Sequence, residues 1–566
     1  FTIVITLIIF SLFRIYSSLW EYAGIEEVFS LIAACLAAAI AKLVIISFTW
    51  SIMPRSWYVL DTIYLMILIG ATRVSYRLIR LRRQNRTFPW SKRKKVMIIG
   101  GGEAGRSLIT EIQNSKYLDQ KVVCIIDDDP YKIGRYIKGV KVVGNRNSIK
   151  KSVKKYNVQQ IILTIPSANA AKIRPIVEIC QDTNCELMIL PGVYQLVNGE
   201  VKASKLRPVN IDDLLGRDEV HVNLNEVMDY VSGRVIMVTG GGGSIGSELC
   251  RQIAKHSPKQ LIIFDIYENN AYDIQQELLR EQPKLDLVVL IGSVRDENRI
   301  NRIFEQYRPE IIYHAAAHKH VPLMEGSPNE AIKNNVLGTY NMVRMADKWN
   351  AKRFVQISTD KAVNPTNIMG ASKRICEMII QTYNKESNTE YVAVRFGNVL
   401  GSNGSVIPLF KKQIAEGGPV TVTHPEIIRY FMTIPEAVSL VLQAGAYAKG
   451  GEIFVLDMGE PVKILDLAKN MIRLSGYKVD QDIKIEFTGL RPGEKLYEEL
   501  LMDEEGMTDT PNKLIHIGHP IDVDEVKLAH ALRVLESAAQ DETDDMRLIV
   551  ESIVPTYHPK LNKSTQ

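Results

Sequence analysis

Cysteine is scarce in this sequence, and its spacing excludes two kinds of site. The chain has six cysteines among 566 residues, and none of them forms a closely spaced pair of the Cys-x-x-Cys kind. A disulfide framework needs a much higher density of cysteine, and a structural zinc site needs paired Cys or His ligands. The sequence therefore predicts neither disulfides nor a metal site.

Acidic residues are missing from one stretch, Arg73 to Lys95, which holds ten Lys or Arg and no Asp or Glu. Because the whole chain has a net charge of +5, the remainder carries −5. A nucleic-acid-binding protein usually spreads basic residues over a folded surface, so nucleic acid is not an expected partner.

A chain of this length also exceeds what one core supports, which predicts two or three domains.

Apolar runs are confined to the first 80 residues. Residues 1–13 (FTIVITLIIFSLF) are shorter than the roughly 20 that a spanning helix needs, and they lack an initiator Met, so we expect a helix whose start is missing. Residues 28–50 have the required length with Lys42 as their one charge, and residues 57–71 continue the pattern. We therefore predict three transmembrane helices over 1–80 and a basic juxtamembrane segment over 81–95. The positive-inside rule puts the following domains in the cytoplasm.

The first glycine-rich turn lies in "KKVMIIGGGEAGRSLITEI", where Gly100, Gly102 and Gly105 fit the pattern G-x-G-x-x-G. Acids follow at Asp127 to Asp129, near the distance expected for a ribose contact. This predicts a Rossmann-like domain over 96–200 and a linker over 201–232. Two interpretations stay open: a nucleotide or effector site, or a structural domain whose glycines allow tight helix packing.

The second turn, "RVIMVTGGGGSIGSELCRQI", joins a β-run to an amphipathic helix and contains Gly240, Gly243 and Gly246. Glycines let the backbone approach a pyrophosphate, which the helix N-terminus attracts. Asp265 ends the next strand, nineteen residues after Gly246, where a carboxylate binds ribose hydroxyls and repels a 2′-phosphate. We therefore predict NAD rather than NADP, bound by a domain over 233–535 that a tail over 536–566 follows.

Six motifs then occur in order: "TGGGGSIGSEL", "HAAAHKHVPLME", "NNVLGT", "ISTDKAVNPTNIMGASK", "VRFGNVLGSNGSVIPLF" and "GLRPGEKLYEEL". Together they resemble the large membrane-bound nucleotide-sugar 4,6-dehydratases, which are extended short-chain dehydrogenases acting on UDP-N-acetylglucosamine for bacterial capsule, O-antigen or protein glycosylation. The resemblance implies an α/β fold with two Rossmann-like doubly wound domains, the second with a small C-terminal substrate-binding part. It also implies a multi-pass protein of the bacterial inner membrane and a homo-oligomer, at least a dimer.

The resemblance implies a tightly bound NAD that is recycled within each turnover. Ser293 is one departure, since the family often has Asp there near the adenine. The implied cofactor contacts are Thr239, Gly240, Gly243, Ser244, Ile245, Gly246, Asp265, Glu268, Ser293, Val294, Ala315, Ala316, Ala317, Asn335 and Lys373.

The catalytic groups implied by the resemblance are Thr359, Asp360 and Lys361, with Lys373 as an anchor for the nicotinamide ribose. Oxidation at carbon 4 of the sugar makes the carbon 5 proton acidic, so water can then leave from carbon 6. We assign Asp360 as the acid at carbon 6 and Lys361 as the base at carbon 5. A neutral Lys361 requires its pKa to fall from about 10.4 through burial or a neighbouring cation. The alternative is a surface Lys361 that only pairs with Asp360.

Met369 occupies the position where short-chain dehydrogenases carry a catalytic Tyr in Tyr-x-x-x-Lys. A thioether cannot carry a proton, so another group must take the proton of the carbon 4 hydroxyl. Thr359 relaying to Asp360 and a bound water are both candidates. We therefore expect an altered proton route rather than an inactive enzyme.

Substrate contacts are expected from cationic and amide side chains that would meet the UDP diphosphate or the sugar. For each, a structural salt bridge or cap is the alternative. The candidates are Lys319, His320, Asn398, Arg429 and Arg491.

The predicted function is a hydro-lyase that converts UDP-N-acetylglucosamine to a UDP-4-keto-6-deoxy sugar. Either configuration at carbon 5 fits, because Lys361 can return its proton to either face. A catalytically silent nucleotide-sugar sensor or scaffold is the alternative, and the presence of Asp360, Lys361 and Lys373 argues against it. An initiating sugar-phosphate transferase would need a different domain after the linker.

Overall fold

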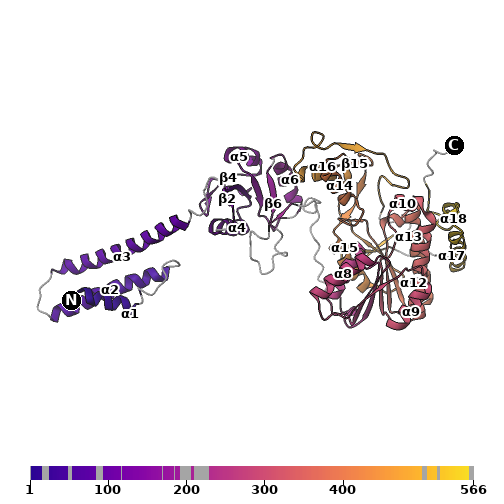
Figure 1. Ribbon diagram of the computed structural model, residues 1–566, viewed down its shortest axis with the longest axis horizontal. Coiled ribbons are helices and arrows are strands. Elements are labelled where there is room, and N and C mark those ends of the chain that lie inside the picture. The colour runs from indigo at the N-terminus through magenta and orange to yellow at the C-terminus, as the bar shows by residue number, and fades with distance from the viewer. Residues whose placement is uncertain are drawn as a thin grey trace. The chain divides into compact units, whose positions relative to one another are not determined.

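The computed structural model describes residues 2–13, 15, 25–48, 54–84, 93–115, 118–168, 170–183, 185–190, 206–209, 228–499, 506–518 and 523–559. Most of the predicted linker (201–232) and of the predicted basic segment (81–95) lies outside these residues. The elements form a helical group, a first α/β domain and a second, larger α/β domain (Figure 1).

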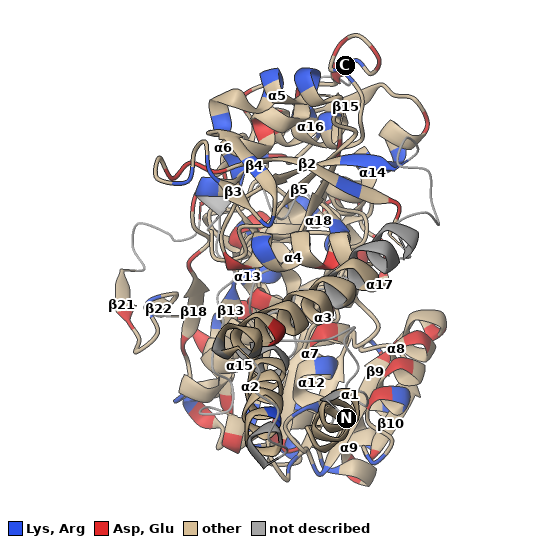
Figure 2. Cartoon of the chain, turned by 90° about the vertical axis from the view of Figure 1, so that its left-hand side faces the viewer, with Lys and Arg blue, Asp and Glu red and all other residues tan. Residues whose placement is uncertain are grey.

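The N-terminal group consists of three helices, as the apolar pattern predicts: α1 (Thr2–Leu12), α2 (Ile25–Phe48) and α3 (Arg55–Gln84). Their described parts carry few charged side chains and are mostly tan in Figure 2. In the described part of the chain, no helix is both long enough and apolar enough to cross a bilayer. α1 has 11 residues, α2 has 24 and α3 has 30.

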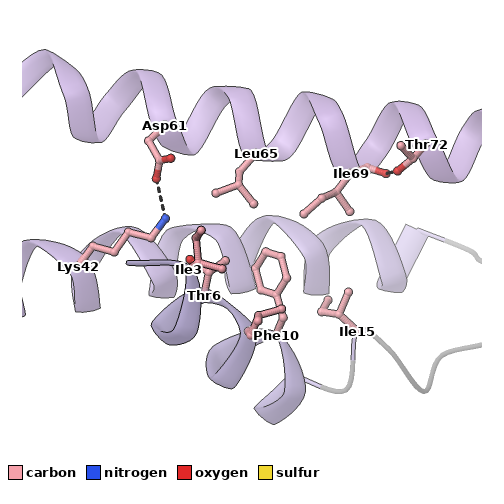
Figure 3. Close-up of a pocket in the computed structure, with 10 residues that line it drawn as sticks. Ile3, Thr6, Phe10, Ile15, Lys42, Asp61, Leu65, Ile69 and Thr72 are labelled. Atoms are coloured by element: carbon pink, nitrogen blue, oxygen red, sulfur yellow. Dashed lines mark hydrogen bonds and ion pairs between the residues drawn. The ribbon is translucent and has the colours of Figure 1, made fainter. Parts of the chain in front are cut away.

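A pocket of about 440 Å³ lies among these three helices, and most of its lining is apolar (Figure 3). Phe10, Leu65 and Ile69 form part of its wall. Lys42 of α2 reaches Asp61 of α3, with Nζ 2.6 Å from Oδ2, and its side chain is only 4% exposed. A buried ammonium group needs such a partner, so this ion pair ties α2 to α3.

The first α/β domain is built around a seven-stranded sheet of order β3-β4-β2-β1-β5-β6-β7. Its central strands are short apolar runs that are buried along most of their length, as parallel strands covered on both faces are. Its elements are β1 (Lys94–Ile99), α4 (Glu103–Asn114), β2 (Gln120–Ile126), β3 (Tyr136–Ile137), β4 (Val140–Gly144), α5 (Ile149–Tyr156), β5 (Gln160–Leu163), α6 (Ala170–Gln181), β6 (Glu186–Ile189) and β7 (Arg207–Pro208).

The second α/β domain has a nine-stranded sheet of order β10-β9-β8-β11-β12-β13-β18-β22-β21. The first seven strands of that order are parallel, and β22 and β21 add antiparallel at the edge. The order reverses between β8 and β11, so the carboxyl ends of these two strands border the crevice in which such sheets bind ligands. The strands are β8 (Val235–Thr239), β9 (Gln260–Asp265), β10 (Leu287–Ile291), β11 (Ile311–His314), β12 (Arg353–Ile357), β13 (Glu390–Arg395), β18 (Ile453–Leu456), β21 (Met507–Asp509) and β22 (Ile515–Gly518).

Helices cover both faces of this sheet and enclose one apolar core on each side. One core contains residues of α7 (Ser244–Ala254), α8 (Glu268–Glu281) and α15 (Ile434–Tyr447). The other contains residues of α9 (Glu297–Tyr307), α12 (Gly338–Lys348) and α13 (Ile368–Glu386) (Figure 1). The expectation of two Rossmann-like α/β sheets is therefore confirmed.

Smaller elements lie between the strands and build the rest of the second domain. Three two-stranded sheets pair β14 with β17, β15 with β20 and β16 with β19. The elements are α10 (Val321–Gly326), α11 (Pro328–Ala331), η8 (Ile332–Leu337), η9 (Asp360–Ala362), β14 (Asn398–Val399), α14 (Val406–Ala415), β15 (Val420–Val422), β16 (Ile428–Arg429), β17 (Phe431–Met432), β19 (Val462–Lys463), α16 (Ile464–Leu474) and β20 (Ile485–Phe487).

The predicted domain end at residue 535 and tail over 536–566 need correction. The boundary falls inside α17 (Glu525–Gln540), and α18 (Met546–Ile553) follows it. Leu535, Met546, Val550 and Tyr557 are fully buried in the core on the α13 side. The second domain therefore continues to at least Tyr557, because these side chains complete its core.

Candidate active site

The second glycine-rich turn is so tight that two of its positions exclude a side chain. Gly240 has a φ of +66°, and an added Cβ there would lie 2.8 Å from the backbone of Ala316. A Cβ on Gly246 would lie 2.0 Å from the carbonyl oxygen of Gly240. These approaches hold the N-terminus of α7 against the ends of β8 and β11, where its N–H groups favour an anion. The cradle fits the pyrophosphate of a dinucleotide.

The other predicted residues of this turn are placed by the start of α7. Gly243 is the extended residue just before the helix. The Ser244 hydroxyl accepts a hydrogen bond of 3.2 Å from the N–H of Asn403, so the turn is tied to the loop after β14. Ile245 packs against the core on the α7 side.

Asp265 ends β9 and fastens the same turn. Its Oδ2 accepts a hydrogen bond of 2.8 Å from the N–H of Gly242, and its Oδ1 accepts one of 2.8 Å from the N–H of Tyr267. Each carboxylate oxygen has a further lone pair that a ribose hydroxyl could use. Glu268, the first residue of α8, is exposed to solvent.

The loop after β10 carries the predicted adenine contacts. The Ser293 hydroxyl accepts a hydrogen bond of 3.2 Å from the N–H of Arg295, which shapes the loop. Val294 is buried against Gly338 at the start of α12, where an added Cβ would lie 2.7 Å from the Val294 side chain. Gly338 therefore allows this loop to lie close to α12.

The end of β11 is fixed by a buried pair, Thr239 and His314. The Thr239 hydroxyl lies 2.6 Å from His314 Nδ1, and the Thr339 hydroxyl lies 3.1 Å from Nε2. Burial, with a smaller effect of Lys373, lowers the pKa of His314 to about 3, so the ring stays neutral. Ala315 and Ala316 donate their N–H groups to Thr239, and Ala317 follows them in the half-buried strand exit.

Asn335 and Lys373 lie inside the protein beside this exit. Asn335 donates to the carbonyl oxygen of His318 and to the hydroxyl of Ser372, each at 3.0 Å, so it joins the β11 exit to α13. Burial lowers the pKa of Lys373, against the opposing effects of Cys376 and Glu377. A buried ammonium beside the cofactor crevice fits the predicted role of a ribose anchor.

The centre of the site is η9, which follows β12 and carries Asp360 and Lys361. The Thr359 hydroxyl donates to Asp360 Oδ1 at 2.7 Å, and Lys361 Nζ donates to the same oxygen at 2.9 Å. Asp360 is 1% exposed, and its Oδ2 is buried without a hydrogen-bond partner. An unsatisfied buried oxygen is costly unless a ligand or solvent completes it, so Oδ2 is available to a substrate hydroxyl.

The charge on Lys361 differs from the expectation. Burial by itself lowers the pKa of Lys361, but the carboxylates of Asp360 and Glu498 together raise it above its ordinary value. Lys361 is therefore an ammonium group while Asp360 is ionised. A base at carbon 5 requires that the negative charge beside Lys361 first be removed.

Met369 lies in the first turn of α13, and its side chain is 3% exposed within the core on the α13 side. Its neighbours in that core include Ile368 and Met324. The residue that replaces the usual Tyr is therefore packed as an apolar side chain.

Two of the predicted substrate contacts instead engage other protein groups. Asn398 accepts a hydrogen bond of 3.4 Å from Lys361 Nζ. Arg429 is 8% exposed and binds backbone carbonyls, including that of Lys495 at 2.7 Å. Asn398 therefore contacts Lys361 directly, and Arg429 holds the segment around Lys495. Contact of either residue with a substrate stays a prediction.

The remaining three, Lys319, His320 and Arg491, come from two separate segments and form a cluster, in which Arg491 also pairs with Glu494, its Nη2 lying 3.2 Å from Oε1. Partial removal from water and the Lys361 charge lower the pKa of Lys319. Burial and the charges of Lys319 and Arg491 lower the pKa of His320. The His320 ring packs on Gly404, where an added Cβ would lie 2.4 Å from it. Such a cluster is suited to an anionic group such as a diphosphate.

Two groups of residues near the site were not assigned from the sequence. Glu498 and Lys495 lie within the motif "GLRPGEKLYEEL", which marked them without giving a role. Glu377, four residues after Lys373, binds Arg395 through two hydrogen bonds of 2.7 Å and accepts one of 2.6 Å from Ser358. A Glu within an apolar helix face was the available signal for the second group.

The first glycine-rich turn has the same local geometry as the second. A Cβ on Gly105 would lie 2.1 Å from the carbonyl oxygen of Gly100. Asp127 Oδ2 accepts a hydrogen bond of 2.6 Å from the N–H of Gly101, as Asp265 does from Gly242. The first turn differs from the second in the ion pair that Asp127 forms with Lys132, whose Nζ lies 3.0 Å from Asp127 Oδ2.

Comparison with known proteins places most of the chain in two family models. Residues 236–520 match a model described as polysaccharide biosynthesis protein, and residues 11–191 match one described as CoA-binding domain.

Among the described residues, no group of three His, Cys, Asp or Glu side chains could hold a metal ion.

Three relatives illustrate the similarity. Capsular polysaccharide biosynthesis protein CapD of Staphylococcus aureus is 47% identical over 498 residues, covering 87% of this chain and 82% of that protein. Probable polysaccharide biosynthesis protein EpsC of Bacillus subtilis strain 168 is 44% identical over 519 residues, covering 91% of this chain and 85% of that protein. The Thermus thermophilus UDP-glucose 4-epimerase, solved in complex with NAD, is 20% identical with a TM-score of 0.41, covering 47% of this chain and 90% of that chain.

Proposed function

The chain belongs to the polysaccharide biosynthesis protein family, and from this premise we propose that it is an NAD-dependent 4,6-dehydratase of UDP-N-acetylglucosamine. At the coarser level, the family makes it a nucleotide-sugar-modifying enzyme of the epimerase and dehydratase type. The observation that carries the finer proposal is the Thr359–Asp360–Lys361 centre, in which one buried carboxylate meets a hydroxyl and an ammonium. An elimination needs such an adjacent acid and base.

The cofactor site supports NAD. The tight approach at Gly240 and Gly246 leaves room for a pyrophosphate, and Asp265 ends the strand that would meet the ribose. A carboxylate there accepts hydrogen bonds from ribose hydroxyls and repels a 2′-phosphate. Gly240, Gly246 and Asp265 would hold NAD, which when bound would supply the hydride acceptor for carbon 4 and the hydride donor for carbon 6.

Thr359 and Asp360 take the proton of the carbon 4 hydroxyl in this proposal. A Thr hydroxyl has one donor and two lone pairs. The Thr359 donor bonds Asp360, and one lone pair accepts the N–H of Lys361 at 3.4 Å, which leaves the other for a substrate hydroxyl. The proton can thus pass through Thr359 to the carboxylate, so Met369 needs no acid or base role.

Protonation of Asp360 then prepares the elimination. A neutral Asp360 no longer raises the pKa of Lys361, while burial and Arg429 lower it. Lys361 can therefore release its ammonium proton to water, which returns it after turnover, and act as the base that takes the proton of carbon 5. Asp360 gives its proton to the carbon 6 hydroxyl, which leaves as water. Lys361 finally returns a proton to carbon 5.

The cluster of Lys319, His320 and Arg491 supports binding of the UDP diphosphate, because Lys319 and Arg491 supply positive charge and the His320 ring can donate a hydrogen bond. Its side chains come from the β11 exit and from the segment after β20, and their charges act on one another. Two phosphates between them would relieve this repulsion, which is a physical reason to place the nucleotide there.

The test is incubation of the purified full chain with UDP-N-acetylglucosamine and no added cofactor, followed by NMR of the sugar. A 4-keto-6-deoxy product is expected, and its coupling constants also give the configuration at carbon 5. Accumulation of the carbon 4 epimer would contradict dehydration and show that the reaction is epimerisation. Unchanged substrate in an NAD-loaded protein would contradict both reactions.

We also propose that the α1–α3 group associates with a lipid bilayer. Its helices expose many large apolar side chains, including Ile3, Leu12, Ile40, Tyr64 and Ile67, and the basic stretch of residues 73–95 follows in sequence. Apolar surface together with basic residues favours anionic lipid. Flotation of the full chain with anionic vesicles, and less with neutral vesicles, is the expected result; absence from both would contradict the proposal.

A further inference from the structure

A segment far along the chain, residues 493–499, is fastened to the loop that carries the Asp360–Lys361 pair. The carbonyl oxygen of Gly493 accepts hydrogen bonds from the Thr366 hydroxyl at 3.0 Å and from Asn367 Nδ2 at 3.1 Å. Lys495 Nζ donates to the carbonyl oxygen of Val363 at 3.1 Å. The segment is thus held against the residues that follow Lys361.

Arg429 fastens the same segment from its other side. Its guanidinium donates to the carbonyl oxygens of Lys495 at 2.7 Å and Leu496 at 3.2 Å. Its Nη2 also lies 3.5 Å from Glu494 Oε1 and 3.7 Å from Glu498 Oε1. Because Arg429 is almost fully buried, it fixes where Glu498 lies.

The Glu498 carboxyl is 5% exposed and lies among charges from three parts of the chain. These are the Asp360–Lys361 pair of η9, Arg429 of β16, and Lys495 of its own segment. Burial raises the pKa of Glu498, as does Asp360, while Lys361 and Arg429 oppose the shift. Lys361 is affected in turn: burial and Arg429 lower its pKa, and the carboxylates of Asp360 and Glu498 raise it.

We propose that Glu498 is a positioning residue of this active site that acts through Lys361. Its negative charge determines the pH range over which Lys361 carries a proton. Arg429 holds Glu498 in place for this role. The inference rests on the proposed function in one respect, because a proton on Lys361 matters for turnover only if Lys361 is the base at carbon 5.

The sign of the effect follows from the charges. Glu498 as a carboxylate stabilises the Lys361 ammonium, so replacing it by a neutral amide of the same size lowers the pKa of Lys361. A single neighbouring charge in a buried site is expected to change that pKa by about one pH unit. Glu499→Gln is the matched control, since Glu499 is adjacent, carries the same charge and is 51% exposed.

The experiment measures the proton on Lys361 directly. The full chain is treated with a trace of acetic anhydride across a pH series, and labelling of Lys361 is read by mass spectrometry. For Glu498→Gln, the labelling midpoint is expected about one pH unit below that of the unchanged chain. Glu499→Gln should match the unchanged chain, and Glu498→Asp, which keeps the carboxylate, should have a labelling midpoint close to that of the unchanged chain. Equal midpoints in Glu498→Gln and the unchanged chain, or equal shifts in both Gln variants, would overturn the proposal.

Turnover gives the second readout and separates the two hypotheses. If the unchanged chain makes a 4-keto-6-deoxy sugar, the acidic limb of its kcat profile should move to lower pH in Glu498→Gln by the same amount as the labelling midpoint. If the chain makes no such product, the proposed function fails, while the labelling midpoints still decide the role of Glu498. Melting temperatures and bound nucleotide, measured for each variant, identify one that fails to fold. If Glu498→Gln fails to fold, Glu498→Ser, which also lacks the charge, carries the comparison with the same expected lowering of the labelling midpoint.

Discussion

At the scale of single residues, the two carboxylate oxygens of Asp360 have different surroundings. Two donors, Thr359 and Lys361, share Oδ1, and Oδ2 is buried without a partner. In the proposed mechanism, this asymmetry gives the carboxylate two functions on its two oxygens: Oδ1 receives a proton through Thr359, and Oδ2 meets a substrate hydroxyl. Sequence alone could place the three residues in one motif, but not the sharing of one oxygen.

Thr359→Val tests the proton relay, since Val has a similar shape without the hydroxyl. Loss of a proton-transfer group is expected to lower kcat by about a hundredfold, with little change in KM. Thr359→Ser keeps a hydroxyl and should retain most of the activity. Steady-state kinetics on UDP-N-acetylglucosamine measure both, and a fully active Val variant would mean that a water molecule takes the proton.

Met369→Tyr tests whether the missing phenol limits the enzyme. The Met369 side chain is buried in an apolar core, so a Tyr hydroxyl there would lack a partner and destabilise the fold by about 1–3 kcal/mol. Urea unfolding should detect this loss, while Met369→Leu should cost less than about 1.5 kcal/mol. We expect no gain in turnover, and an inactive parent rescued by Tyr would sink the altered proton route.

The protein contacts of Arg429 and Asn398 could not be predicted from the sequence. Both were expected at the substrate, and both contact groups around Lys361. Arg429 meets residues more than 60 positions later in the chain, and such contacts depend on the fold of the segment after β20. A motif gives the residue type but not which of two nearby acceptors it binds.

At the scale of elements, a buried charge network joins β12, β13 and α13 beneath the active site. Glu377 of α13 binds Arg395 of β13 and Arg374, and it accepts the hydroxyl of Ser358 that follows β12. Both Glu377 and Arg395 have no exposed surface. These contacts fix α13, which carries Lys373, relative to the strand end that carries Asp360.

Glu377→Gln should therefore destabilise the fold strongly. It removes the carboxylate that binds the buried Arg395 and Arg374, and breaking a buried ion pair from one side costs about 3–5 kcal/mol. Glu386→Gln, on the exposed end of the same helix, should stay within about 0.5 kcal/mol of the unchanged chain. Urea unfolding monitored by circular dichroism measures both, and equal stabilities would contradict the role of the network.

The pH dependence of stability follows from the same residue. Although burial alone would raise the pKa of Glu377, Arg395 and Arg374 lower it from 4.5 to about 2. Because the pKa is lower in the folded state, the stabilisation is complete above pH 4.5 and disappears as the pH falls toward 2. Between these limits the unchanged chain should lose about 3 kcal/mol through Glu377, a loss that Glu377→Gln should not show. Parallel pH curves for the two proteins would contradict this assignment.

In the proposed function, the second glycine-rich turn is the element that holds the cofactor. Gly246→Ala would bring a Cβ within 2.0 Å of the Gly240 carbonyl oxygen, so α7 must move away from the strand ends. Nucleotide released from the denatured variant should fall well below one per chain. Gly326→Ala is the control, because an added Cβ there meets nothing within 4 Å. Full nucleotide content in Gly246→Ala would contradict the placement of the cofactor.

At the scale of the whole molecule, the sequence predicted the two Rossmann-like sheets because their strands are continuous apolar runs followed by glycine turns. β8, with every residue buried, is such a run. It did not predict that the chain after residue 535 completes a core, because α17 and α18 are short amphipathic helices whose partner surface lies elsewhere in the sequence. Apolar length also predicted three N-terminal helices, but not their pairing through Lys42 and Asp61.

The most direct test of the central claim follows the hydrogen at carbon 4 of the substrate. UDP-N-acetylglucosamine carrying deuterium at carbon 4 is incubated with the full chain, and the position of the label is read by NMR. A 4,6-dehydratase that recycles its NAD moves this label within one active site, so we expect deuterium in the carbon 6 methyl group. Label that remains at carbon 4, or that is lost to solvent, would contradict the account.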